Sequence, residues 1–200
     1  VKRSSDKLAG ELSVKSGSSV FICSNPKIFR WFIVNDNGGA KNGDKVVIQV
    51  VNWGNPFAGL LPVGKVIEVL GPSGDPQVEL LTVIRQYNLP LEFPEDVLAE
   101  ANQLPEKISP EDYRQRRDLR NLYTFTIDPI TAKDFDDAIA IEKMANGWRL
   151  YVHIADVAHY LSVQGAIFQE AAKRGNSFYF PKMVIPMLPE RISNLICSLR

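Results

Sequence analysis

Short apolar, β-prone runs separated by turn residues dominate the first half of the chain. Residues 19–23, 29–34, 45–51 and 64–71 each have this character, and turns such as Asn35–Gly39 and Asn42–Asp44 separate them. In the last run, strict alternation would put Val66 and Val69 on opposite faces of the strand, which indicates a bulge or a strand buried on both faces. Four or five short strands in about 60 residues predict a small β-barrel of the OB or cold-shock type. An SH3-like barrel would give a similar pattern.

The pattern of the second half is mixed. Helical periodicity covers residues 76–87, 94–103 and 164–174, and Gly175 stops the last of these. Residues 122–127, 138–141 and 148–155 are predicted strands, and the last two form a hairpin around the Ala145–Gly147 turn. Extended segments follow at 178–181 and 184–189, with a short helix expected at 193–199. The predicted class is α+β and rich in β-structure.

Composition and charge exclude several classes of protein. The 200 residues are 45% hydrophobic and 23% charged, with a formal net charge of zero, so overall charge gives no argument for nucleic acid. Residues 1–91 hold 10 basic and 7 acidic residues, and the remainder has the opposite excess of three. No apolar run approaches the roughly 18 residues of a membrane span, so we expect no membrane partner.

Cysteine usage and the two ends suggest where the protein works. Cys23 and Cys197 lie far apart and lack metal-ligand spacing, so we expect free buried thiols and a cytoplasmic location. The chain begins with Val1 and stops after an apolar segment, which suggests a piece of a longer protein. Residues 1–18, rich in Ser and Lys, are expected to be flexible.

Four carboxylates within ten residues are the strongest chemical signal: Asp128, Asp134, Asp136 and Asp137. Like charges this close repel, and Lys133 alone cannot balance them. Clustered hard oxygen ligands suit Mg²⁺, or Mn²⁺, better than zinc. A solvated acidic turn is the alternative, whereas an EF-hand is excluded by its missing Gly and Glu.

Aromatic and basic side chains are candidates for RNA contact. Phe29 and Trp31 alternate onto one face of a predicted strand, as in barrels that stack bases, although a core position is favoured for Trp31 as for Phe21 and Phe32. Trp53 lies in a Gly/Asn/Pro loop and is expected to be exposed. The run Arg114–Arg120 is either a solvated helix face or a set of phosphate contacts. Tyr179 either stacks on a base or packs against its neighbours.

These motifs, in this order, resemble those of the ribonuclease II and ribonuclease R family. The resemblance rests on five stretches: Arg117–Arg120, Thr126–Asp128, Asp134–Ala138, Tyr151–Val157 and Ile185–Glu190, with Cys197–Leu199 after them. It implies Mg²⁺-dependent 3′→5′ hydrolysis of single-stranded RNA to nucleoside 5′-monophosphates. It also implies metal binding by Asp128, Asp134 and Asp137 and a catalytic role for Asp136. Tyr179 matches a base-stacking tyrosine, and Arg117 and Arg120 are carried over as RNA contacts.

The resemblance also implies a domain plan. A flexible segment (1–18) precedes an OB or cold-shock-like domain (19–88), a helical linker (89–121) and the N-terminal part of a mixed α/β RNB catalytic domain (122–200). The rest of the catalytic domain and an S1 domain are missing, so we expect this piece to be weakly active or inactive. A non-catalytic RNA-binding module and an interaction protein with a solvated acidic loop remain alternatives.

Overall fold

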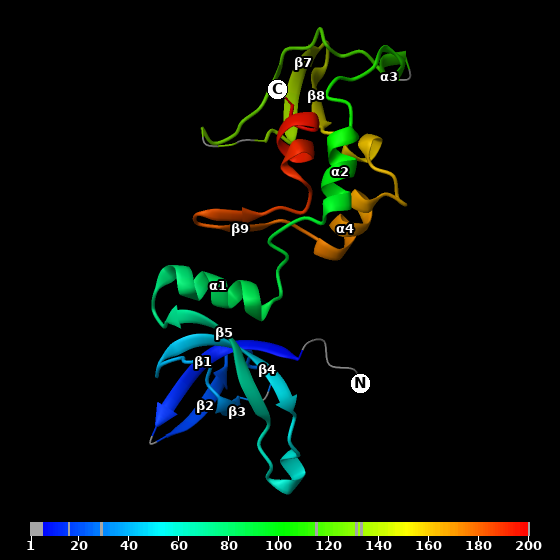
Figure 1. Ribbon diagram of the computed structural model, residues 1–200. Helices are drawn as coiled ribbons and strands as arrows, with labels where there is room; N and C mark the ends of the chain where they lie inside the picture. The colour runs from blue at the N-terminus through cyan, green and yellow to red at the C-terminus, as the bar shows by residue number, and fades with distance from the viewer. Residues whose placement is uncertain are drawn as a thin grey trace. The chain divides into compact units, whose positions relative to one another are not determined.

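The computed structural model divides into two compact units, Val1–Leu89 and Pro90–Arg200 (Figure 1). It describes residues 6–15, 17–28, 30–114, 116–130, 132 and 134–199. None of the helices in these ranges has the length and apolar character needed to cross a membrane.

The first unit is a closed five-stranded barrel. Its strands are β1 (Lys7–Lys15), β2 (Ser18–Cys23), β3 (Trp31–Asp36), β4 (Asp44–Asn52) and β5 (Val63–Pro72), in the order β1-β2-β3-β5-β4. Antiparallel pairing of β1 with β4 closes the barrel, and only the β3–β5 pair among these is parallel. Register shifts between β4 and β5 account for the change of phase in the fourth predicted strand. The predicted barrel is confirmed.

The first strand corrects our expectation for the N-terminal segment. Residues 7–15 were expected to be flexible, but they pair with both β2 and β4. Leu8 and Leu12 are buried in the barrel core and Ala9 is also buried, which offsets the low β-propensity of the surrounding Lys, Ser and Gly residues. Gly10 permits a close approach here, since a Cβ atom would lie 2.1 Å from the Ile22 carbonyl oxygen. The barrel therefore begins at Lys7, not at residue 19.

The aromatic residues of the barrel divide between core and surface. Phe21 and Phe32 are fully buried and meet edge to face at 5.7 Å, as predicted. Trp31 is 53% exposed, so the core position favoured for it is wrong. Trp53 is half-buried with its ring 5.9 Å from Phe32, so its expected exposure is wrong too. Strand alternation explains Trp31, whose neighbours Phe32 and Val34 face inward.

Helix α1 (Pro76–Gln86) packs against β1, β4 and β5 and completes this unit. Asp75 caps its N-terminus, because the carboxylate accepts hydrogen bonds from the backbone nitrogens of Gln77 and Val78 at 2.8 and 3.4 Å. Val78, Thr82 and Ile84 form its buried face. A one-turn 3₁₀ helix, η1 (Pro56–Ala58), lies in the loop between β4 and β5.

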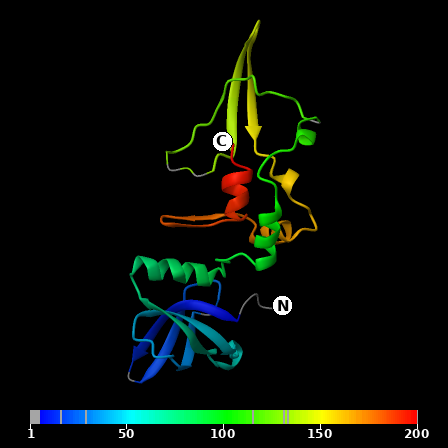
Figure 2. The same cartoon turned by 45° about the horizontal axis from the view of Figure 1, so that its top comes forward.

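Helices α2 (Glu95–Gln103) and α4 (Ala166–Arg174) and the C-terminal helix η3 (Arg191–Ile196) form the core of the second unit. Figures 1 and 2 show these three helices together at the base of a β-hairpin. Val97, Ala101, Ile167, Ile192 and Cys197 are buried between them. This corrects the expected helical linker at 89–121, because α2 is part of a core. Among the described residues of this expected linker, the second helix is the short α3 (Pro110–Arg114).

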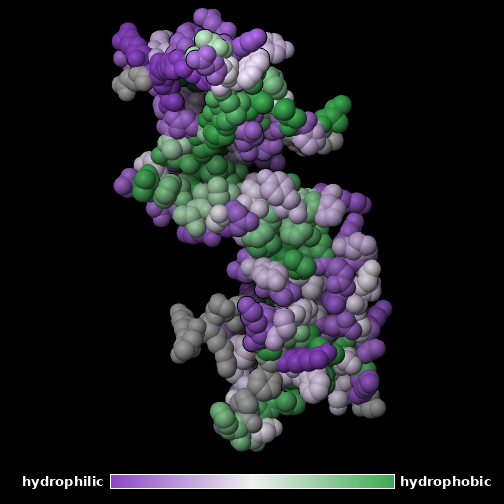
Figure 3. Space-filling view, turned by 180° about the vertical axis from the view of Figure 1, so that it is seen from behind, coloured by the Kyte–Doolittle hydropathy of each residue, from purple (hydrophilic) through white to green (hydrophobic). Residues whose placement is uncertain are grey.

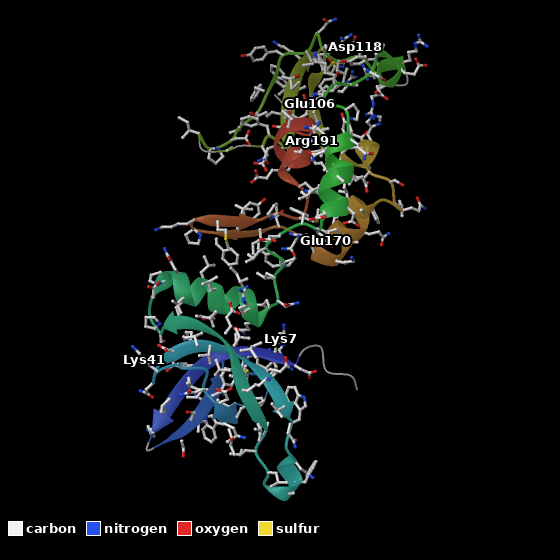
Figure 4. All side chains as sticks on the ribbon, viewed as in Figure 1. Lys7, Lys41, Glu106, Asp118, Glu170 and Arg191 are labelled. Carbon is white, nitrogen blue, oxygen red and sulfur yellow. The ribbon has the colours of Figure 1, made fainter. Side chains whose placement is uncertain are left out.

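Two arginines tie loops to these helices. Arg174 is buried and donates hydrogen bonds to the carbonyl oxygens of Pro90, Glu92 and Pro186, while Glu170 pairs with it at 3.0 Å. Arg191 bonds the carbonyl oxygens of Ala101 and Leu104 and pairs with Glu106 at 2.9 Å (Figure 4).

Two small sheets complete the unit. The first has the order β6-β7-β8, with strands β6 (Thr124–Phe125), β7 (Asp137–Met144) and β8 (Gly147–Ile154). The second is the hairpin of β9 (Phe178–Phe180) and β10 (Met183–Ile185). A 3₁₀ helix, η2 (Val157–Tyr160), follows β8.

Candidate functional site

The four aspartates of the acidic stretch, here called the acidic cluster, lie near one end of the β6-β7-β8 sheet. Phe125 of β6 pairs antiparallel with Ile139 of β7. Asp128 lies three residues after Phe125, and Asp136 three residues before Ile139, so both leave the sheet at the same end. Asp137 is the first residue of β7. The pairing of two strands therefore brings residues from separate segments to one place.

Three hydrogen bonds fix the backbone of the acidic cluster. The nitrogen of Ala155, just after β8, donates to the carbonyl oxygen of Asp136 at 3.0 Å. The nitrogen of Phe135 donates to Ser198 Oγ at 3.1 Å, and the carbonyl oxygen of Phe135 accepts from the nitrogen of Leu199 at 2.8 Å. The backbone on both sides of Asp136 is thus held by segments distant in sequence.

Like charges dominate the electrostatics of the acidic cluster. Partial burial raises the pKa of the Asp136 carboxyl, and the negative charges of Asp134, Asp137 and Asp128 raise it further. All three partners are thus close enough to destabilise the Asp136 carboxylate. Lys133, which is the basic residue of the acidic stretch, lies outside the described residues, as does Thr131.

A hard divalent cation fits this donor set. Carboxylate oxygens are the ligands that Mg²⁺ and Mn²⁺ prefer, and mutual repulsion is what a cation relieves. Within the described ranges no three His, Cys, Asp or Glu side chains already converge on a common point. Asp128, Asp136 and Asp137 are exposed, so their side chains have room to rotate, and a hydrogen bond from Ala155 holds the backbone at Asp136. These three residues and the half-buried Asp134 are the groups that could hold the ion.

Three of the other residues predicted to contact RNA lie in the second unit. Tyr179 is on β9, pairs in register with Val184 and is 75% exposed, so it is not packed into the core. Arg117 and Arg120 are exposed in the segment after α3. Arg120 makes two bonds to Asp118, at 2.8 and 2.6 Å, and this neutralises part of its charge. Both interpretations of the basic run remain open.

In the barrel unit, Trp31 is available for contact, and Phe29 lies outside the described residues. Exposed Lys27 and Arg30 precede the Trp31 strand. Exposed aromatic and basic side chains thus lie close together in the sequence at Trp31, and RNA contact there stays a prediction.

Sequence reasoning missed a cavity beside the acidic cluster, in which ionisable side chains lie among apolar ones. The cavity, about 350 Å³ in volume, is lined by Arg116, Asp156, His159, Cys197 and Ser198 among others. Arg116 pairs with Asp156 at 2.5 Å, and His159 lies 3.4 Å from Asp112. The Asp136 charge contributes to a raised pKa of the Cys197 thiol, after burial, which is the larger cause. No sequence signal joins these residues, because they come from four separate segments.

Two family models match the chain, the cold shock domain at residues 21–94 and the RNB domain at residues 116–200. Ribonuclease R of Thermotoga maritima is 43% identical over 204 aligned residues, which include all of this chain. The chain belongs to the ribonuclease R family. It spans 28% of the length of the Thermotoga relative. This family is one of exoribonucleases, in accordance with the resemblance seen in the sequence motifs.

Solved structures of the family share the fold. Mycoplasma genitalium RNase R in complex with ribose-methylated single-stranded RNA matches with a TM-score of 0.80 at 31% identity, over 100% of this chain and 32% of that one. Yeast Ssd1, described as a pseudonuclease, matches with a TM-score of 0.69 at 18% identity, over 96% of this chain and 25% of that one. The second likeness concerns fold alone, so the fold by itself does not distinguish a nuclease from a non-catalytic relative.

Proposed function

We propose that this chain carries an RNA-binding barrel and the first part of the catalytic centre of a 3′→5′ exoribonuclease. Its substrate is single-stranded RNA, and its products are nucleoside 5′-monophosphates. The observation that supports this most strongly is the acidic cluster: the pairing of β6 with β7 brings Asp128 and Asp136 out at the same end of the sheet, with Asp137 at the start of β7. The protein is proposed to work in the cytoplasm.

Within this proposal, Asp128, Asp134 and Asp137 hold Mg²⁺, or Mn²⁺, and Asp136 acts directly in catalysis. A divalent ion bound here supplies charge neutralisation for the phosphate and lowers the pKa of a bound water. The bonds from Ala155 and Leu199 and to Ser198 keep the backbone of Phe135 and Asp136 in place. A backbone that is held in place reduces the rearrangement that Asp136 needs before the reaction.

RNA is proposed to contact both units. Trp31 on the barrel and Tyr179 on β9 are exposed aromatic residues suited to stacking on bases, and Phe29 is included from the sequence. Arg117 and Arg120 are proposed to contact phosphates. Arg117 has the freer charge, because Arg120 is bonded to Asp118.

The test uses a protein of the relatives' full length that contains this chain. With a single-stranded 3′-tailed RNA and Mg²⁺, we expect release of mononucleotides, and we expect Asp136→Asn to reduce the rate at least a hundredfold. Asp96→Asn, on α2, is the matched control and should leave the rate unchanged. Equal rates for Asp136→Asn and the control would refute the catalytic assignment. This chain alone is expected to be weakly active or inactive.

The second candidate is an RNA-binding module without hydrolysis, because the same fold occurs in a protein described as a pseudonuclease and the fold therefore does not decide between the two. All four aspartates are present here, which supports the catalytic proposal instead. RNA binding by the full-length protein with no Mg²⁺-dependent release of mononucleotides would establish the second candidate.

A further inference from the structure

The loop between β4 and β5 is an unusual surface feature. From Val51 to Val63 the sequence contains no charged residue. Phe57 has a fully exposed side chain, and Leu60 and Leu61 are 61% and 43% exposed. These three residues are here called the apolar tip. Figure 3 shows hydrophobic surface at the end of this hairpin, below the body of the barrel. A single exposed apolar side chain is ordinary, but three together in an uncharged loop indicate a binding surface.

The apolar tip is held in one shape. Asn55 and Leu60 exchange two backbone hydrogen bonds of 3.0 Å each, and Asn55 Oδ1 accepts a bond of 3.1 Å from the nitrogen of Phe57. Gly54 has a φ of +66°, and a Cβ atom there would lie 2.3 Å from the carbonyl oxygen of Leu60. Phe57 is therefore presented to solvent by an ordered loop, which reduces the entropy lost on binding.

The apolar tip adjoins the barrel surface proposed to bind RNA. The nitrogen of Ile33 donates to the carbonyl oxygen of Pro62 at 2.8 Å, and β3 and β5 run parallel from there. The end of the loop thus lies beside the start of β3, which carries exposed Trp31 and Ile33. Lys65 on β5, the strand paired with β3, is exposed and basic, as are Lys27 and Arg30 in the segment before β3.

The side chains of the apolar tip suit a nucleobase better than a phosphate. With no cation between Val51 and Val63, the loop offers nothing to neutralise a phosphate. A free aromatic ring suits a nucleobase, since every base has a π-face, and in OB folds the loop between strands 4 and 5 is a site of oligonucleotide binding. We propose that Phe57 stacks on an unpaired base of the RNA strand that crosses β3 at Trp31. This inference rests on the proposed RNA-binding function of the barrel.

The experiment measures binding of the full 200-residue chain to a fluorescently labelled 12-nucleotide oligoadenylate by anisotropy. We expect Phe57→Ala and Phe57→Leu each to weaken binding about fivefold or more, and Phe57→Tyr to stay within about twofold of the wild type. The slope of log affinity against log salt should not change in Phe57→Ala, whereas Lys65→Ala should lower it by about one. Leu98→Ala, which shortens an exposed apolar side chain on α2, is the matched control and should have no effect.

The outcomes separate this inference from the proposed function. If the wild-type chain binds RNA and Phe57→Ala binds equally well, the stacking role is wrong while RNA binding by the barrel stands. If Phe57→Leu binds as tightly as Phe57→Tyr, the apolar tip acts by hydrophobic contact and base stacking is refuted. If the wild-type chain does not bind the oligonucleotide at any salt concentration, both proposals fail. Phe57 makes no core contact, so its substitution should not impair folding.

Discussion

The backbone nitrogen of Phe135 donates a 3.1 Å hydrogen bond to Ser198 Oγ, across 63 residues of sequence. The bond joins the segment between Asp134 and Asp136 to the residues after η3. Together with the bond from Leu199 to the carbonyl oxygen of Phe135, it makes the acidic cluster dependent on the C-terminal segment. The geometry of the site is thus set by contacts outside the aspartates themselves.

Ser198→Ala removes the acceptor for Phe135 and should loosen the acidic cluster. Leaving a half-buried N–H group without its partner costs about 1 kcal/mol or more. We therefore expect a loss of this size in the free energy of unfolding, measured by urea titration. We also expect weaker Mn²⁺ binding, measured by electron paramagnetic resonance. Ser193→Ala is the matched control, since the Ser193 hydroxyl bonds only to neighbouring Asn194 among the described residues. Identical metal affinities for the two variants would contradict the positioning role.

Replacement of Arg174 should strongly destabilise the second unit. Its side chain is 1% exposed, pairs with Glu170 and lies 3.8 Å from the centroid of the Phe93 ring. Arg174→Met leaves the Glu170 carboxylate buried without its close partner and leaves several carbonyl oxygens without a donor. We expect a loss of about 3 kcal/mol or more, measured by urea unfolding with hydrogen exchange to assign the loss to this unit.

Arg174→Lys distinguishes charge from geometry. Lysine keeps the positive charge but lacks the planar fork that reaches several carbonyl oxygens at once, so it should recover only part of the stability. Lys173→Ala is the control, because Lys173 is adjacent but largely exposed and should change stability by less than about 0.5 kcal/mol. Full recovery by lysine would show that only the charge matters.

Most of the barrel could be predicted from the sequence because β2 to β5 coincide with apolar runs bounded by turns. The strand β1 could not, because its Lys, Ser and Gly residues hide Leu8 and Leu12, which enter the core. The exposure of Trp31 was also missed, since residue type favours burial and only the strand phase reveals the outward direction. The local pattern of apolar and polar residues thus predicts where a strand lies better than it predicts which face of the strand is buried.

The acidic cluster could be predicted, because its carboxylates are close in sequence and carry a recognisable motif. Its supports could not be predicted. Ala155 and Leu199 act through backbone groups that every residue carries, and Ser198 acts through a hydroxyl. Only the tertiary fold brings these three residues to Phe135 and Asp136. The ordered apolar tip was missed for a related reason, since Trp53 drew attention in that loop while the exposed aromatic ring is Phe57.

Glu100→Ala should loosen the start of α4. The N-cap residue of α4 is Gly165, which has no side chain, and Glu100 of α2 substitutes for a cap. Its Oε2 accepts hydrogen bonds from the backbone nitrogens of Ala166 and Ile167 at 2.5 and 3.3 Å. Loss of this acceptor at a helix N-terminus should cost about 1 kcal/mol. Hydrogen exchange at the amides of Ala166 and Ile167 should rise.

Two further variants check the role of Glu100. Glu100→Gln keeps an acceptor without the charge and should show a smaller effect than Glu100→Ala. Gln103→Ala, an exposed substitution at the end of α2, should leave exchange at α4 unchanged. If exchange at Ala166 and Ile167 is the same in Glu100→Ala as in the wild type, the capping role is wrong.

The ion pair between Glu68 of β5 and Arg85 of α1 should make the barrel unit sensitive to acid. Two bonds of 2.8 Å join the side chains, and the hydrogen bond from Arg85 holds the pKa of Glu68 below its ordinary value. A carboxyl with a lowered folded pKa stabilises the fold above its unfolded pKa, about 4.3. That contribution is lost as the pH falls through the folded pKa. Because the pair is partly exposed, we expect it to contribute up to about 1 kcal/mol.

Arg85→Met tests this contribution directly. The variant should be less stable than the wild type at pH 7, and the difference between them should shrink as the pH is lowered from 5 towards 3. Urea midpoints for the barrel unit, followed by hydrogen exchange in β5 and α1, measure both. High salt should reduce the difference at pH 7, since the pair is accessible to counterions. A difference between the two proteins that stays constant from pH 7 to pH 3 would show that Arg85 stabilises α1 by packing and not through Glu68.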